Sequence, residues 1–202
     1  MESDRERDSG RDQKSPWFPT IREEIEGNYK AEKIPADNKQ GYRMEYSYIG
    51  DYFAPNDDAL KLKKAKIRIG ILCVACVLLY FCAVLQKSYV SADRIVFGGS
   101  LLSAVLLLFE VSGVIQLLLR KDVLTSRALM DLSFQLKIMP LFHGGLLLLC
   151  SFSAAAAAVR GPGGAAAYLT AACYAFSGIS SILIFLQYRK LGYMRIPTSP
   201  FE

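Results

Sequence analysis

The sequence has little of what enzymes use for chemistry. It contains a single histidine, His143, and all five cysteines lie within apolar runs rather than in loops. It has no nucleotide-binding glycine motif, no zinc-ligand pattern and no nucleophile-elbow motif. We therefore predict no cofactor, no bound metal and no catalytic residue, and we favour a protein that is not an enzyme. The placement of the cysteines also excludes a disulfide framework outside the membrane.

Acidic residues become rare after the first third of the chain. Only five of the nineteen follow Asp58: Asp93, Glu110, Asp122, Asp131 and Glu202. Basic residues continue in the short segments between long apolar runs, so these segments account for the net charge of +5. A basic balance of this kind is a signal of membrane topology and does not indicate nucleic-acid binding.

Four apolar runs are long enough to cross the roughly 30 Å hydrocarbon core of a bilayer. We predict transmembrane helices at about residues 67–86, 94–119, 140–159 and 165–187. The predicted fold class is an all-α membrane protein whose four transmembrane helices form an up-down bundle. The lipid bilayer is then the first partner of the chain.

The third apolar run is too long for a single span, because residues 129–159 as one helix would measure about 46 Å. Pro140 offers a break, since proline suits the first turn of a helix and disfavours helix in the residue before it. We predict an interfacial amphipathic helix at about residues 125–139, followed by the span. A continuous helix through Pro140 is the alternative.

Two tails flank the predicted transmembrane domain of residues 59–190. Residues 1–58 are expected to be mostly disordered, because their first part carries almost no apolar side chains. From Trp17 onward this tail is rich in aromatic residues, and residues 42–48 alternate as in a strand with one apolar face. A lone strand is unstable, so a strand here would need to pair with something else. The interpretation that we favour is a disordered tail whose aromatic side chains rest on the membrane surface. Residues 191–202 form a C-terminal tail.

Lysine and arginine set the orientation. One side of the predicted membrane domain has only Lys87, Arg94 and Arg160. The other side has Lys61, Lys63, Lys64, Lys66, Arg68, Arg120, Lys121, Arg127, Arg189, Lys190 and Arg195. The positive-inside rule then places both termini in the cytoplasm. We expect an integral protein of the plasma membrane.

Glu110 is the most unusual residue, because it lies inside an otherwise uncharged apolar run. An ionisable group at membrane depth is costly and normally has a partner or a function. Depth along the predicted helices makes His143 its first candidate partner, and Tyr174 and Ser177 on the fourth span are further hydrogen-bond donors. A proton- or cation-coupled site and a purely structural contact between helices both fit this pattern.

Three functions follow from these features. The first is a scaffold, anchor or regulatory subunit that binds a protein partner through its cytoplasmic tail, or associates with itself. The second is a small oligomeric transporter or channel that uses Glu110. The third is an enzyme acting on a lipid or quinone at the interface, with His143 as acid or base. The Cys73-x-x-Cys76 motif is interpreted as packing rather than as redox or metal chemistry, because it lies inside a span and no loop cysteine exists to exchange with it.

Overall fold

The computed structural model describes residues 29–35, 41–56, 58–86, 88–120, 123–161 and 164–196. The chain divides into two compact units. One comprises Met1–Asp51 with Pro197–Glu202, and the other is Tyr52–Ile196. The predictions for residues 1–28 and 197–202 lie outside the described residues.

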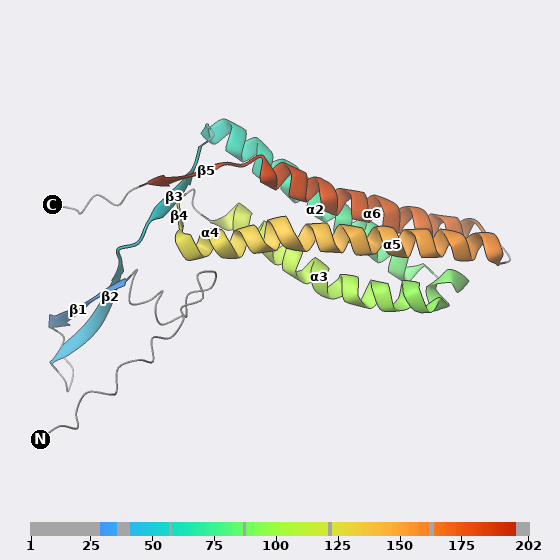
Figure 1. Cartoon of the computed structure of the whole chain (residues 1–202), viewed down its shortest axis with the longest axis horizontal. Helices are drawn as coiled ribbons and strands as arrows, with labels where there is room; N and C mark the ends of the chain where they lie inside the picture. The colour runs from blue at the N-terminus through green and yellow to red at the C-terminus, as the bar shows by residue number, and fades with distance from the viewer. Residues whose placement is uncertain are drawn as a thin grey trace, which may run out of the picture. The chain divides into compact units, whose positions relative to one another are not determined.

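The second unit contains four helices that are long and apolar enough to cross a membrane (Figure 1). They are α2 (Ala59–Leu85), α3 (Arg94–Leu119), the continuous helix Ser126–Arg160, and α6 (Ala165–Arg189). A short 3-10 turn, Tyr89–Ala92, joins α2 to α3. These helices have the length and composition of spans in an integral membrane protein.

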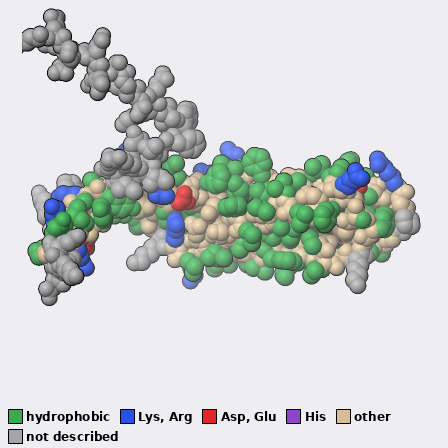
Figure 2. Space-filling model, turned by 90° about the horizontal axis from the view of Figure 1, so that it is seen from below, with side chains coloured by type: hydrophobic (Ala, Val, Ile, Leu, Met, Phe, Trp, Pro, Cys, Tyr) green, Lys and Arg blue, Asp and Glu red, His purple; other side chains and the backbone are tan. Residues whose placement is uncertain are grey.

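The lipid-facing character of this unit is visible on its surface. Large apolar side chains such as Leu108 and Phe152 are 71% and 76% exposed. Hydrophobic side chains extend along the length of the helices, and Lys and Arg gather at the two ends (Figure 2). A protein surrounded by water rarely exposes so much apolar surface. A bilayer around the middle of the helices accounts for these exposed side chains.

The third span differs from the predicted break at Pro140. The structure has a continuous helix composed of α4 (Ser126–Ser133), a π-helical turn (Phe134–Ile138) and α5 (Met139–Arg160). Pro140 has no N–H to donate, and the chain responds with a wider turn in which the Met139 N–H bonds the Phe134 carbonyl. The apolar face of the predicted interfacial helix packs inward, since Leu132 and Leu136 are fully buried among the other helices.

Close helix crossings use small residues. Gly144 on α5 faces Gly178 on α6, and a Cβ added to either would lie under 3 Å from the other's carbonyl oxygen. The most extensive helix contacts are between α5 and α6 and between α2 and α6, and α3 packs mainly on α5. The small residues let backbones approach closely, as is common between membrane helices.

A three-stranded sheet lies at one end of the helices, which we call the sheet end. Its central strand β3 (Tyr52–Pro55) pairs antiparallel with β4 (Leu124–Thr125) and with β5 (Tyr193–Ile196). The predicted helical fold therefore holds for the four long helices, and these short strands were not predicted: β3 lies in the segment assigned to the N-terminal tail and β5 in the segment assigned to the C-terminal tail. Their pairing joins segments that are far apart in sequence, which no local pattern reveals.

The other unit contains a hairpin. Its strands are β1 (Tyr29–Pro35) and β2 (Tyr42–Tyr48), and the Tyr29 and Tyr48 rings meet edge to face at 5.2 Å. The alternation at residues 42–48 corresponds to β2, whose partner is the chain's own β1, so the favoured disordered tail is wrong at these residues. Residues 1–28 and 36–40 lie outside the described residues, so the prediction of a mostly disordered tail stays a prediction there.

Candidate functional site

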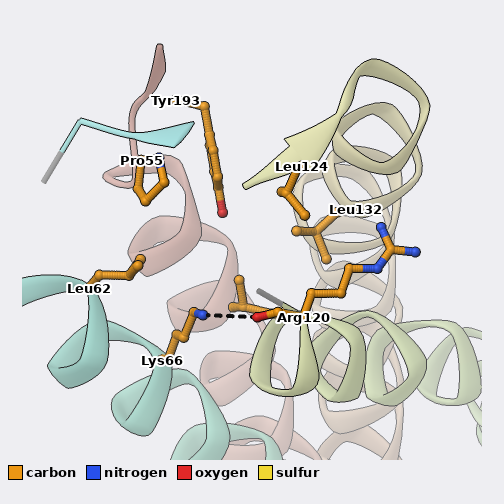
Figure 3. Close-up of a pocket in the computed structure, with 8 residues that line it drawn as sticks. Pro55, Leu62, Lys66, Arg120, Leu124, Leu132 and Tyr193 are labelled. Atoms are coloured by element: carbon orange, nitrogen blue, oxygen red, sulfur yellow. Dashed lines mark hydrogen bonds between the residues drawn. The ribbon is translucent and has the colours of Figure 1, made fainter. Parts of the chain in front are cut away.

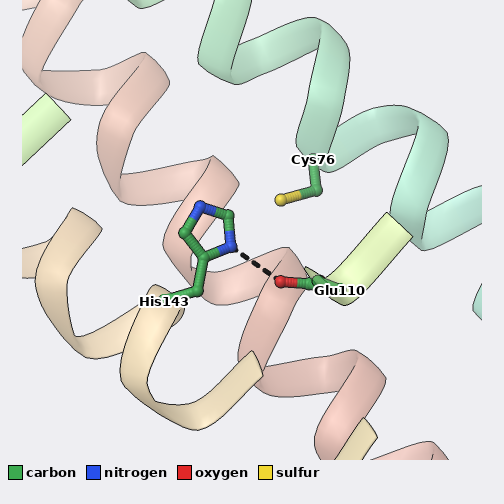
Figure 4. Close-up of side chains that lie close together, drawn as sticks. All are labelled: Cys76, Glu110 and His143. Carbon is green, nitrogen blue, oxygen red and sulfur yellow. Dashed lines mark hydrogen bonds and ion pairs between the residues drawn. The ribbon is translucent and has the colours of Figure 1, made fainter. Parts of the chain in front are cut away.

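Glu110 and His143 meet at the centre of the four helices. Glu110 lies on α3 and His143 lies on α5, one turn after Pro140. Glu110 Oε2 is 2.7 Å from His143 Nδ1, and both side chains are 0% exposed (Figure 4). This distance is that of a hydrogen bond, in which either the His143 Nδ1–H donates to the carboxylate or a carboxyl O–H donates to Nδ1.

Ser181 on α6 is the third member of the site. Its hydroxyl lies 2.7 Å from Glu110 Oε2 and 2.9 Å from the Pro140 carbonyl oxygen, and it is fully buried. A hydroxyl has one hydrogen to donate, so these two acceptors compete for it. The contact ties the carboxylate to the backbone of α5 just beyond the π-helical turn.

Cys76 on α2 completes the cluster. Ligand atoms of Cys76, Glu110 and His143 all lie within 4.8 Å of one another, and all three residues are buried. The thiol points toward the His143–Glu110 contact in Figure 4. Cys76 also bonds Ser177, whose hydroxyl donates to the Cys76 carbonyl at 2.9 Å. Each of the four long helices thus contributes one side chain to this site.

Apolar layers enclose the site at both ends. Toward the sheet end it is covered by a cluster that includes Leu117, Leu136 and Ile184. Away from it lies a second cluster that includes Tyr80 and Leu147. The Tyr80 ring stands edge-on to the His143 ring at 6.5 Å. The polar atoms therefore lie in surroundings of low polarity, where electrostatic contacts are strong and unpaired groups are costly.

Two atoms of the central pair lack partners among the described residues. Glu110 Oε1 and His143 Nε2 are buried and accept or donate no hydrogen bond. Leaving such a group unsatisfied costs about 1–3 kcal/mol. Buried unsatisfied groups are exceptions in native proteins, and a functional role or a bound ion or water is the usual explanation.

The residues predicted from the sequence fall into two groups. Glu110 and His143 are in contact, as described above. Tyr174 is buried among Tyr80 and Leu147, and it makes no hydrogen bond to Glu110. Ser177 bonds Cys76 instead. Ser181, one turn farther along the same stripe of α6, takes the place expected for Ser177.

Sequence reasoning did not assign Cys76 and Ser181 to this site. Ser181 belongs to the polar stripe of the fourth span, which also holds Thr170 and Ser177. Cys76 belongs to the Cys73-x-x-Cys76 motif, whose residues occupy the buried face of α2. Both signals were therefore present as helical faces, and the missing information was the offset of one helix along another.

A second feature is a small pocket at the sheet end. It is lined by Pro55, Leu62, Lys66, Leu117, Arg120, Leu124, Leu132 and Tyr193 (Figure 3). Its lining is mostly apolar, and the Lys66 ammonium donates to the Arg120 carbonyl at 3.5 Å. Arg120 in turn donates to the Ala128 carbonyl. These bonds join α2, α3 and α4, which fits a structural role at this end.

The fold and the site define an integral membrane protein with a buried polar cluster shared by its four long helices. Comparison with family models, curated proteins and solved structures finds no match to this chain. Its function is therefore inferred from the site alone.

Proposed function

We propose that this chain is a proton-binding membrane protein of the transporter class, with the Glu110–His143 pair as the proton site. One observation carries this proposal. The two partners contact each other through one atom each, while Glu110 Oε1 and His143 Nε2 stay unpartnered in a fully buried site. Ionisable residues within membrane helices commonly belong to proton or ion pathways.

A purely structural contact explains this arrangement less well. Polar contacts between membrane helices contribute about 0.6 kcal/mol on average. The two unsatisfied atoms cost about 1–3 kcal/mol each. A pair selected only to hold α3 against α5 would be better replaced by apolar residues. A role in reversible protonation explains why the pair is present despite this cost in stability.

The surrounding helices favour proton exchange. The Ser181 hydroxyl can donate either to Glu110 or to the Pro140 carbonyl, which lie at similar distances. The π-helical turn ends two residues before Pro140, and such turns often lie at functional sites. A small movement of α5 would therefore change the hydrogen bonds of the carboxylate and its affinity for a proton.

The proposal includes the membrane topology. The four helices cross the plasma membrane in up-down order, and the sheet end with both termini faces the cytoplasm. The excess of Lys and Arg at that end supports this orientation. Because four helices alone enclose little space, the transporting form is an oligomer of this chain.

A pH step tests the proposed proton site. Proteoliposomes holding the full chain are adsorbed on a solid-supported membrane and exposed to a rapid change of pH. We expect a transient current as a proton enters or leaves the buried pair. Glu110→Gln should reduce this current to the level of protein-free liposomes, because it removes the carboxylate that stabilises the charge on His143.

The matched control is Asp131→Asn. Asp131 lies on α4 and its side chain is exposed, so this change removes a carboxyl without touching the site. The control should keep the wild-type current. A wild-type protein without a pH-dependent current, or a Glu110→Gln protein that keeps it, would contradict the proposed function.

A second candidate function is a scaffold, supported by the hairpin in the N-terminal unit. Its β2 strand exposes large side chains, with Tyr46 at 60% and Met44 at 43% exposure. Exposed aromatic residues are common at protein interfaces. In this case the helices anchor the hairpin, and the hairpin binds a protein partner.

Deletion of residues 1–51 tests the scaffold. This cut removes the hairpin and keeps β3, so the sheet of the second unit stays complete. The shortened protein should insert normally and lose any protein that copurifies with the full chain in mild detergent. An unchanged set of copurifying proteins would contradict the scaffold function and would not bear on the proton site.

A further inference from the structure

We infer that the central cluster is also a binding site for a divalent transition-metal ion such as Zn²⁺, with Cys76, Glu110 and His143 as its ligands. This inference rests on the same residues as the proposed proton site and names the cargo that would exchange with protons there. The structure brings the three side chains together from α2, α3 and α5, with all ligand atoms within 4.8 Å of one another.

The chemistry of the donor set favours a borderline metal. A thiolate, an imidazole and a carboxylate are the three ligand types that Zn²⁺ uses in proteins. Magnesium and calcium prefer sites made only of oxygen ligands. A site with three protein ligands leaves a fourth position, which the Ser181 hydroxyl or a water molecule can fill. Zinc sites with three protein ligands keep one coordination position for a water molecule or another ligand.

The geometry needs only small side-chain shifts. Zinc bonds of about 2.0–2.3 Å at tetrahedral angles place neighbouring ligand atoms about 3.3–3.7 Å apart. Glu110 Oε2 and His143 Nδ1 are now 2.7 Å apart, so they must separate slightly to admit an ion between them. The unpartnered Glu110 Oε1 lets the carboxylate turn one oxygen to the metal while the other keeps the Ser181 hydroxyl.

The charges balance in the exchange. Before binding, the Cys76 thiol is neutral, and the Glu110–His143 pair is neutral when one proton lies between Oε2 and Nδ1 and His143 Nε2 carries a second hydrogen, which stays on the imidazole throughout. Binding of one M²⁺ forms bonds to a thiolate, a carboxylate and a neutral imidazole, and it releases the thiol proton and the proton shared by the pair. The site is neutral again, because two negative ligands match the ion. An electroneutral exchange avoids leaving an unpaired charge in the membrane.

Metal binding to the full chain in detergent tests the inference. We expect one Zn²⁺ to bind per chain and two protons to be released per ion, measured by calorimetry in buffers of different ionisation enthalpy. Cys76→Ser should weaken binding by more than about 100-fold, the upper end of what loss of a supporting contact costs a metal site. The matched control is Cys82→Ser, an exposed cysteine of the same helix, which should bind like the wild type.

Cobalt provides a spectroscopic readout of the metal site in the wild-type protein. Co²⁺ bound to the wild-type protein should show a thiolate-to-metal charge-transfer band, and Cys82→Ser should keep this band. Three results would each overturn the metal site. They are a wild-type protein that does not bind Zn²⁺, a Cys76→Ser protein with wild-type affinity, and a Co²⁺ spectrum without the thiolate band.

The metal site and the proton site can fail separately. The wild-type protein is measured for both the pH-step current and Zn²⁺ binding, and Cys82→Ser should keep both. A protein that binds Zn²⁺ through Cys76 but gives no pH-step current refutes the proton function and supports the metal site. A protein that gives the current but binds no Zn²⁺ does the reverse.

Discussion

Replacing His143 with leucine is expected to lower the free energy of unfolding by about 3–5 kcal/mol, the range for removing one partner of a buried ion pair. The change leaves the Glu110 carboxyl between apolar layers, where Ser181 is its one remaining hydrogen-bond partner among the described residues. Equilibrium unfolding in mixed micelles, followed by circular dichroism, measures the loss. The helices themselves should still form, because their backbone bonds are internal.

A double variant is the control for this prediction. Glu110→Met combined with His143→Leu removes both polar partners and keeps similar side-chain volumes. We expect it to recover most of the lost stability, because replacing a buried pair by apolar residues is often neutral or stabilising. A double variant less stable than His143→Leu alone would show that the two side chains do not stabilise each other and would contradict the pairing.

Replacing Gly144 with alanine is expected to destabilise the contact of α5 with α6 by about 1–3 kcal/mol, the usual cost of overpacking. The added Cβ would lie 2.7 Å from Ile182 Cγ1 and 2.8 Å from the Gly178 carbonyl oxygen. The carbonyl belongs to the helix backbone, so it cannot turn aside as a side chain does. Thermal unfolding in detergent measures the effect.

The adjacent residue provides a matched control. A Cβ added at Gly145 has no atom within 4 Å. Alanine there should be neutral or stabilise the helix by up to about 1 kcal/mol, since it is the better helix former. Equal losses for the two variants would mean that helix propensity, rather than the crossing of α5 and α6, controls stability here.

Much of the helical architecture was predictable from the sequence. Within a bilayer a backbone must bond to itself, so each long apolar run becomes a helix. The predicted spans at residues 94–119 and 165–187 agree with the ends of α3 and α6 to within a few residues. Helical spacing and depth also predicted His143 as a partner of Glu110, because both depend only on the rise and repeat of a helix.

Other features depended on contacts between distant segments. The sheet needs β3, β4 and β5, which lie more than sixty residues apart along the chain and carry too short a pattern to predict pairing. The continuous third helix depended on a π-helical turn that absorbs the missing N–H of Pro140. Both outcomes follow from hydrogen bonds that local sequence does not specify.

The sequence by itself determined that Glu110 lies inside a membrane helix and needs a partner. Only the tertiary structure decided that Ser181 rather than Ser177 donates to it, and that Cys76 joins the cluster. A helical stripe fixes which face a residue occupies, but not how far one helix slides along its neighbour. That offset is set by packing, as at Gly144 and Gly178, and a difference of one turn exchanges one serine for the next.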